Sequence, residues 1–298
     1  PDHMSVIVTG DRQVRLSWRP VMDRLEPTAR PAGYKVYSQE EGKGFDTGIF
    51  TADTSFLLDL QEWKTIYSFR VTALNQGGES MPGETLSVSL LPEGHVPVLI
   101  VNAFDRICGP SFFDQGNMAG IAWWDDEGVA CGKEYGFSGY QYDFNRNSDW
   151  LHDDSQGWGA SYAGMETMPV MGNTFDFPYI HGKALRDAGY SFVSVSDEVF
   201  GSPDFEMRSY RTADIIFGEE RGTSSIGNAK AREFRVFTSE IIQAISRFTQ
   251  QGGNVFASGA HIGTDMIENN DTMAMRFASE VLHFTWRTSH ATQVGKVY

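Results

Sequence analysis

The stretch YSFRVTALNQGGES, residues 67–80, decides the fold of the first part of the chain. Apolar and aromatic side chains occupy every second position from Tyr67 to Ala73, and the turn residues Asn75 to Gly78 follow. Such alternation places the apolar side chains on one face of a strand, and Asn and Gly favour a reversal of the chain. The stretch therefore predicts one strand and one turn of an antiparallel sheet.

The same pattern extends outward from this stretch, from Ser5 to about Leu91. Short apolar or alternating runs recur there, each bounded by turn residues: Val6–Val8, Val14–Trp18, Tyr34–Tyr37, Phe56–Leu58 and Leu86–Leu90. Strands that are separated by turns every 8–12 residues are typical of an all-β antiparallel sandwich.

Four residues give this sandwich a family resemblance. Trp18 lies on the second strand, Tyr34 on the third, and Leu60 precedes Tyr67 by seven residues. Together with residues 67–80, this pattern resembles a fibronectin type III domain, which we expect over residues 1–94. The resemblance implies that Tyr67 is the corner tyrosine, whose hydroxyl bonds back to the backbone. It also implies a spacer or docking module typical of extracellular proteins, and it does not imply catalysis.

After the linker Pro92–His95, the pattern changes to continuous apolar runs that alternate with helical periods. The runs are Val98–Val101, Phe192–Val195, Ala213–Phe217 and Asn254–Gly259, and the helices are expected at about 179–188, 234–251 and 272–282. This alternation predicts that residues 95–298 form an α/β doubly wound parallel sheet. Residues 109–178 show no clear period and are expected to form a long irregular insertion.

Composition excludes several classes of protein. The 298 residues are 41% hydrophobic and 21% charged, which is typical of a globular chain and not of a disordered one. The net charge of −15 argues against a nucleic-acid partner. No apolar run approaches the ~18 residues of a membrane helix, so no membrane insertion is expected. Cys108 and Cys131 form either one disulfide or two buried thiols, and the sequence leaves both open.

Polar or glycine-rich segments follow each of the four expected parallel strands: Asn102–Arg106, Ser196–Glu198, Gly218–Gly222 and Gly259–Asp265. Ligands bind beyond the carboxyl ends of the strands in open parallel sheets. We therefore expect a ligand site at this edge, with Asp105, Glu219 and His261 as candidate catalytic residues.

The segment around His261 has a resemblance of its own. An amphipathic helix, Gly252–Gly253, an apolar strand and then Gly259-x-His261-x-Gly263 resemble the nucleophile elbow of class I glutamine amidotransferase-like, flavodoxin-like domains. That family has a cysteine where this chain has His261, so amidotransferase chemistry is not expected. His261 is either a general base or a structural histidine at a helix start that Thr264 or Asp265 caps.

Ser161 is a further catalytic candidate. Gly159-x-Ser161-x-Ala163 differs by one residue from the Gly-x-Ser-x-Gly elbow of serine hydrolases. The polar residues 153–156 precede it, where that elbow has an apolar strand. The alternative is a glycine-rich loop in which Ser161 bonds to the backbone.

A candidate calcium site lies in the same insertion. Its oxygen-bearing residues recur at EF-hand-like spacing: Asp143, Asn145, Asn147, Asp149 and Asp154. Ser148 replaces the usual glycine, and Asp154 replaces the usual bidentate glutamate. The pattern therefore predicts either a Ca²⁺ site or a solvated turn. No other cofactor is expected.

Aromatic residues are also concentrated in the insertion: Trp123, Trp124, Tyr135, Phe137, Tyr140, Tyr142, Trp150, Trp158 and Tyr162. Aromatic rings beside carboxylates and amides stack on sugar rings, and they equally bury an irregular segment. Both interpretations remain open.

Residues 98–106, 157–163 and 258–265 resemble recurring stretches of Bacteroidetes envelope proteins labelled xanthan lyase or N-acetylmuramoyl-alanine amidase. The resemblance implies a secreted, periplasmic or cell-surface location, an extracellular glycan or peptidoglycan partner, and further domains of a longer parent chain. Two functions remain open. One is a non-catalytic, glycan-associated accessory module of a protein that processes polysaccharide or peptidoglycan. The other is a hydrolase or polysaccharide lyase with its site around His261, Glu219 and Asp105.

Overall fold

The computed structural model describes residues 1–22, 25–105, 112–122, 133–134, 140–162, 170–171, 176–225 and 228–289. The chain divides into two compact units, residues 1–105 with 176–298, and residues 106–175. Within the described ranges, no helix is both long and apolar enough to cross a membrane.

The N-terminal strands form the two layers that a fibronectin type III sandwich requires. One layer contains β1 (Asp2–Val8), β2 (Gln13–Arg19) and β5 (Ser55–Asp59), and the other contains β4 (Ile49–Thr51), β3 (Gly33–Glu40), β6 (Tyr67–Asn75), β7 (Gly78–Glu79) and β8 (Leu86–Val88). The stretch that begins at Tyr67 is thus a strand, and the next strand, β7, pairs back with it.

The residues that predicted this sandwich lie where the pattern placed them. Trp18 is buried and its ring meets that of Tyr34 edge to face, with 5.3 Å between the ring centroids. The Tyr67 hydroxyl accepts a hydrogen bond from the backbone N–H of Glu62 at 3.0 Å. The expected corner tyrosine is therefore confirmed.

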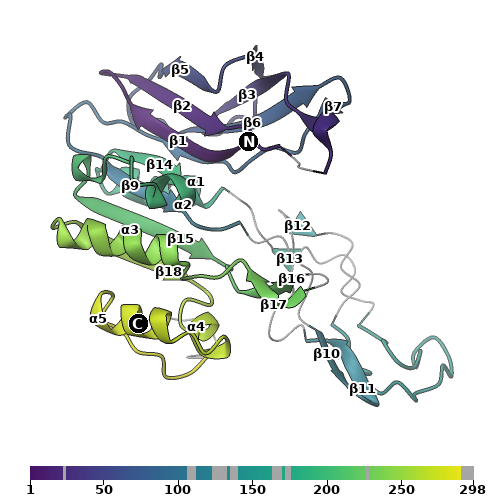
Figure 1. Ribbon diagram of the computed structural model, residues 1–298. Helices are drawn as coiled ribbons and strands as arrows, with labels where there is room; N and C mark the ends of the chain where they lie inside the picture. Colours follow the sequence, from purple (N-terminus) through teal and green to yellow (C-terminus); the bar gives the residue numbers. More distant parts are fainter. Residues whose placement is uncertain are drawn as a thin grey trace. The chain divides into compact units, whose positions relative to one another are not determined.

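The second part of the chain is a mixed α/β region around four parallel strands. These are β9 (Val98–Asn102), β14 (Phe192–Ser196), β15 (Thr212–Gly218) and β18 (Asn254–Gly259), in the spatial order β18-β15-β9-β14. Figure 1 shows β15 and β18 side by side and running in the same direction. Because the strands are parallel, their carboxyl ends lie at one edge of the sheet.

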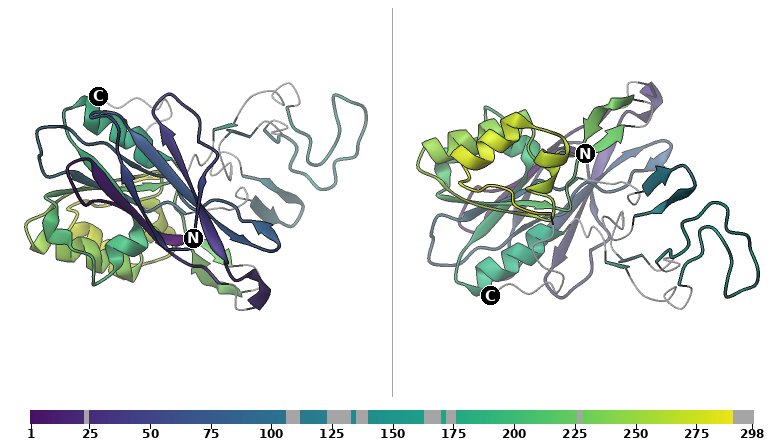
Figure 2. Two further views of the ribbon diagram at one scale, coloured as in Figure 1. Left: turned by 90° about the horizontal axis from the view of Figure 1, so that it is seen from above. Right: turned by 90° about the horizontal axis from the view of Figure 1, so that it is seen from below.

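Helices cover both faces of these strands. α1 (Phe177–Asp187) packs against a cluster that includes Val98 and Ile100, whereas α3 (Ser239–Gln250) belongs to the cluster that includes Leu99 and Val101. Side chains alternate across a strand, so the two clusters lie on opposite faces. Figure 2 shows α1 in teal on one side and α3 to α5 in green to yellow on the other.

The remaining described elements are short. They are α2 (Asp197–Gly201), α4 (Thr264–Glu268), α5 (Thr272–Glu280), the 3-10 helices Pro27–Ala29 and Met207–Ser209, and the strands β16 (Thr223–Ser225) and β17 (Asn228–Glu233). The helix expected from residue 234 begins at Ser239, because the Thr238 hydroxyl accepts a hydrogen bond from the Ile241 N–H and caps the first turn.

The sandwich and the parallel strands share one sheet of seven strands, in the order β18-β15-β9-β14-β1-β2-β5. β1 pairs antiparallel with β14, with Ser5 opposite Val195 and Val6 opposite Ser194. One hydrophobic cluster also contains residues of both parts. The expected domain boundaries, 1–94 and 95–298, stay predictions. The structure shows that strands from both sides of residue 94 are hydrogen-bonded to each other.

In the unit of residues 106–175, the described ranges include two small strand pairs. β10 (Phe112–Gln115) and β11 (Met118–Ile121) form a hairpin, and β12 (Lys133–Glu134) pairs with β13 (Val170–Met171). Several residues of the sequence analysis lie outside the described ranges: Cys108, Cys131, Trp123, Trp124, Tyr135 and Phe137.

Candidate functional site

Acidic side chains gather at the carboxyl ends of three neighbouring parallel strands. Asp105 follows β9, Asp197 and Glu198 follow β14, and Glu220 follows β15. The chain leaves β9 towards β14 on one side and then crosses to β15 on the other side. Such a reversal of strand order opens a crevice beyond the strand ends, which is where open α/β sheets bind ligands.

Three of these carboxylates lie close enough to share one ligand. One oxygen each of Asp105, Asp197 and Glu198 lies within 4.8 Å of the other two. In the part of the chain that the structure describes, this is the one group of three or more acidic, histidine or cysteine ligands with that property. Asp105 is exposed, whereas Asp197 and Glu198 are partly buried, so the group opens towards solvent on the side of Asp105.

Two further carboxylates, those of Glu220 and Glu84, lie at the same edge of the sheet as this cluster. Glu220 is buried, and its Oε2 accepts a hydrogen bond from the Asp105 N–H at 3.1 Å. Glu84 comes from the sandwich, where it precedes β8, and its Oε2 accepts a hydrogen bond from Nδ2 of Asn102 at 2.7 Å. The fibronectin-like part thus contributes a side chain to the edge of the parallel sheet.

The crowding of negative charge shifts the pKa values of the cluster upward. Although part of Asp105 is exposed, the protein atoms around its carboxylate displace water and raise its pKa to about 6, and the negative charge of Glu198 adds to that shift. Burial raises the pKa values of Glu84 and Asp197 well above their usual range, and in both cases the charges of Glu198 and Asp105 contribute as well. All three shifts have the same meaning: the ionised form of each carboxyl group is destabilised by burial and by the negative charges around it.

This arrangement is suited to two kinds of chemistry. Clustered carboxylate oxygens are the ligands that Ca²⁺ and Mg²⁺ prefer. Neighbouring carboxyl groups also serve as general acid and base in glycoside hydrolysis. The geometry of the cluster is compatible with either.

The sequence-predicted residues Glu219 and His261 lie at the same edge of the sheet. Gly218 of β15 is paired with Gly259 of β18, and the Ala260 N–H donates to the Gly218 carbonyl at 2.7 Å. Glu219 and His261 follow these residues directly, and both are partly buried. The glutamate that bonds to the Asp105 backbone is, however, Glu220 and not Glu219.

The helix start after His261 differs from the expectation. Gly263 is the N-cap of α4, and no side chain caps that helix. Asp265 is buried and instead accepts hydrogen bonds from the Gly222 N–H at 2.7 Å and the Val236 N–H at 3.2 Å. Asp265 therefore fixes two loops that precede and follow β16 and β17, and the expected cap by Thr264 or Asp265 was wrong.

Ser161 belongs to the other compact unit, residues 106–175, where its backbone forms an isolated bridge with Gln141. The structure does not join it to Asp105, Glu219 and His261 in one unit.

The candidate calcium loop lies in that unit as well. The Asn145 N–H donates to Asp143 Oδ1 at 3.0 Å, and the Asn147 N–H donates to Asn145 Oδ1 at 3.1 Å. Asp143, Asp149 and Asp154 do not form a group with the spacing of the Asp105 cluster. The calcium site stays a prediction.

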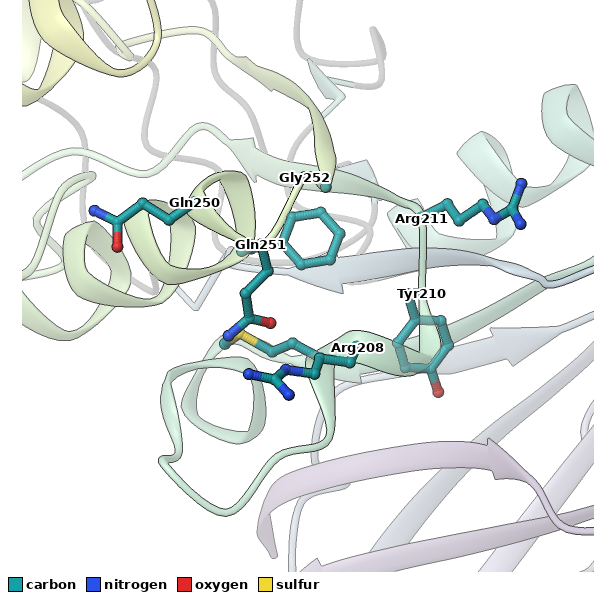
Figure 3. Close-up of a pocket in the computed structure, with 9 residues that line it drawn as sticks. Arg208, Tyr210, Arg211, Gln250, Gln251 and Gly252 are labelled. Atoms are coloured by element: carbon teal, nitrogen blue, oxygen red, sulfur yellow. The ribbon is translucent and has the colours of Figure 1, made fainter.

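Figure 3 shows a pocket of about 510 Å³ at the opposite edge of the parallel strands. Arg211 and Gly253 line it, and they directly precede β15 and β18, so it lies at the amino ends of the strands. Burial raises the pKa of Tyr210, which also lines it, to about 12. None of the sequence-predicted site residues lines this pocket.

Four acidic residues at this edge were not predicted as site residues: Asp197, Glu198, Glu220 and Glu84. Asp197 and Glu198 carried a usable signal, because they directly follow the buried strand β14, and Asp105 follows β9 after two residues. Glu84 carried none. It lies in a run of turn residues of the sandwich, and only the folded chain brings it to Asn102.

Comparisons with known proteins concern the N-terminal part. The fibronectin type III family model matches residues 1–89. Similar solved structures include a myokine, with 20% identity and a TM-score of 0.26, in a match that covers 30% of this chain and 95% of the myokine. The structure of chicken CNTN1 FN1–FN3 has 19% identity and a TM-score of 0.26, and the match covers 30% of this chain and 33% of that one. The FN5 domain of Drosophila Lar has 22% identity and a TM-score of 0.24, and the match covers 30% of this chain and 94% of that domain. No curated protein matches the sequence. The family match makes residues 1–89 a fibronectin type III domain, and domains of this family are typically accessory or extracellular-type modules.

Proposed function

We propose that the chain is a non-catalytic, glycan-associated accessory region of a secreted, periplasmic or cell-surface bacterial protein that processes polysaccharide or peptidoglycan. The observation that supports the glycan partner is a group of exposed aromatic side chains in residues 140–162. Their exposed fractions are 39% for Tyr142, 64% for Trp150, 49% for Trp158 and 56% for Tyr162. Large aromatic rings that stay exposed are more often binding surfaces than packing.

Contacts within the same unit hold three of these rings, those of Tyr142, Tyr162 and Trp158. The rings of Tyr142 and Tyr162 lie 4.9 Å apart between their centroids. The indole N–H of Trp158 donates to the Ala119 carbonyl at 2.8 Å, and the guanidinium of Arg146 lies 5.3 Å from the Trp158 ring. A ring that is fixed before binding loses little conformational entropy when it stacks on a sugar.

The accessory character of the α/β part rests on the resemblance of residues 95–298 to an amidotransferase-like, doubly wound domain. Four parallel strands with helices on both faces support that fold. The nucleophilic cysteine of that family is replaced by His261. Without the cysteine, a covalent thioester cannot form at this elbow.

Glycan binding can be tested by affinity electrophoresis and calorimetry with soluble polysaccharides, including xanthan, and with soluble peptidoglycan fragments. We expect the full chain to bind at least one of them. Trp150→Ala and Tyr162→Ala should each weaken binding about tenfold, which is the loss of one ring's stacking. Because both side chains are exposed, the melting temperature should stay within about 2 °C.

Leu151→Ala is the matched control, since Leu151 is 67% exposed and adjoins Trp150. It removes a similar apolar side chain and should leave glycan binding unchanged. Absence of binding to every glycan, or equal losses in Leu151→Ala and Trp150→Ala, would contradict the proposal.

A second candidate function is a hydrolase or polysaccharide lyase at the ends of the parallel strands. The convergence of Asp105 with Asp197 and Glu198 favours it, because neighbouring carboxyl groups perform acid–base catalysis on glycosidic bonds. Turnover of the same polysaccharides by the purified chain, lost in Asp105→Asn and Glu198→Gln but retained in Asp204→Asn, would select this function. His261→Ala tests whether the histidine contributes to it.

A further inference from the structure

The carboxylate cluster contains more negative charge than its own hydrogen bonds satisfy. Asp105, Asp197 and Glu198 offer ligand atoms within 4.8 Å of one another, and no positively charged side chain forms an ion pair with any of the three among the described residues. Carboxylates at this distance in partly buried surroundings repel one another by several times the repulsion in water. The cluster therefore needs either protons or a cation.

A second observation points to a cation. Asn102, at the end of β9, is only 1% exposed, and its Oδ1 has no hydrogen-bond partner. Its Nδ2 donates to Glu84, and in the sheet Asn102 lies opposite Ser196, the residue before Asp197, and three residues before Asp105. Asp197 Oδ1 is likewise buried without a partner. Buried oxygen atoms without a hydrogen-bond partner are rare in proteins. A cation can bind to the lone pairs of such oxygens.

The types of ligand atom restrict which cation fits. The cluster offers carboxylate and amide oxygens, and neither a thiolate nor an imidazole belongs to the group. Oxygen-only sets select hard cations such as Ca²⁺ and Mg²⁺ over zinc or copper. The exposed side at Asp105 leaves room for water ligands, which both ions commonly retain.

We propose that Asp105, Asp197 and Glu198, together with Oδ1 of Asn102, bind one hard divalent cation at the carboxyl edge of the parallel strands. This site goes beyond the proposed glycan association, which rests on residues 140–162. It is also separate from the predicted calcium loop at Asp143–Asp154, which lies in the other unit.

The test uses the full chain after removal of metal with EDTA. Calorimetric titration with CaCl₂ and with MgCl₂ should show one equivalent of at least one ion that Asp197→Asn and Glu198→Gln weaken at least tenfold. At a hundredfold excess over the dissociation constant, the ion should raise the melting temperature by about 5 °C, and the two variants should lose this rise.

The variants also have a signature in the absence of metal. Replacing one of three mutually repelling carboxylates relieves repulsion, so Asp197→Asn and Glu198→Gln should melt at a higher temperature than the wild type in EDTA. Loss of binding then cannot result from unfolding. Asp204→Asn, an exposed carboxylate on the turn after α2, is the control with the same change in charge and should leave both readouts unchanged.

Asp143→Ala distinguishes a cation at the carboxylate cluster from one at the predicted calcium loop. It should leave the binding of one ion at the cluster unchanged. Three results would overturn the proposal. They are no binding of either ion at millimolar concentration, an isotherm that Asp197→Asn and Glu198→Gln do not change, or lower melting temperatures of these variants in EDTA.

Discussion

Two groups of buried polar residues lie in the same unit and differ in how their hydrogen bonds are satisfied. The first, the serine seam (Ser87, Ser191 and Ser194), joins the sandwich to β14. Ser194 Oγ donates to the Ser87 carbonyl and accepts from the Ser87 N–H, both at 2.7 Å, and Ser191 Oγ accepts from the Leu91 N–H at 2.9 Å. The second is the carboxylate cluster, where oxygens of Asn102 and Asp197 are buried without partners.

This difference indicates that the polar groups of the seam stabilise the fold, whereas those of the carboxylate cluster are suited to bind a ligand. The seam is neutral and its three hydroxyls are paired, and the buried hydroxyl of the nearby Ser89, which has no partner, carries no charge. The cluster is charged and incompletely paired. Because an unpaired buried charge costs far more than an unpaired hydroxyl, a chain retains such a cluster only where it has a use.

The largest expected effect concerns the seam. Ser194→Ala removes the hydroxyl that satisfies both the N–H and the carbonyl of Ser87, and the backbone groups stay buried. The free energy of unfolding should fall by about 2–4 kcal/mol, measured by urea denaturation of the full chain. Ser55→Ala, an exposed serine of β5, is the control and should change stability by less than about 0.5 kcal/mol. A loss in Ser194→Ala no larger than that of the control would show that the seam contributes nothing.

The seam also shows what the sequence could and could not predict. Each parallel strand could be predicted, because runs such as Val98–Val101 and Phe192–Val195 are continuously apolar. The pairing of β1 with β14 could not be predicted. β1 is an ordinary sandwich strand in sequence, and its second neighbour is set by tertiary packing.

The site divides in the same way. The polar segments after the strands predicted the edge and Asp105, because parallel strands bring their carboxyl ends together. Choosing Glu220 instead of Glu219 would have required knowing which side chain the turn after β15 buries, and two adjacent glutamates carry no signal for that. Glu84 required the contact between the sandwich and β9.

The next expected effect tests a paired polar group within the sandwich alone. Tyr67→Phe removes the acceptor of the Glu62 N–H and should lower the free energy of unfolding by about 1–2 kcal/mol, measured by denaturant unfolding. Tyr37→Phe, in which the lost hydroxyl contacts the exposed side chain of Glu79, is the control and should cost less.

The same substitution sharpens the comparison when it is made in residues 1–94 alone, which we expect to fold because Trp18, Tyr34 and Tyr67 form a core within this segment. Tyr67→Phe should cost the same in the fragment as in the full chain. If the fragment is unfolded, the sandwich depends on β14, and the seam is then essential for folding of both parts.

The smallest expected effect concerns the candidate calcium loop, whose carboxylates differ from those of the cluster. Oδ1 of Asp143 already accepts the Asn145 N–H, and Asn145, Asp149 and Asp154 are exposed, so the loop bears little unrelieved repulsion. Asp143→Ala should therefore lower stability without metal by about 0.5 kcal/mol, through loss of one exposed hydrogen bond, whereas Asp197→Asn should raise it. With millimolar Ca²⁺, Asp143→Ala should lose any rise in melting temperature that the loop provides. This rise should be smaller than the one at the cluster, because the exposed carboxylates of the loop repel one another less before the ion binds. Thermal melts of both variants in EDTA and in Ca²⁺ measure all four values. Equal melting curves of the wild type in EDTA and in Ca²⁺ would exclude the calcium loop, and a higher melting temperature of Asp143→Ala in EDTA would show that its carboxylate is repelled in the way that the cluster is.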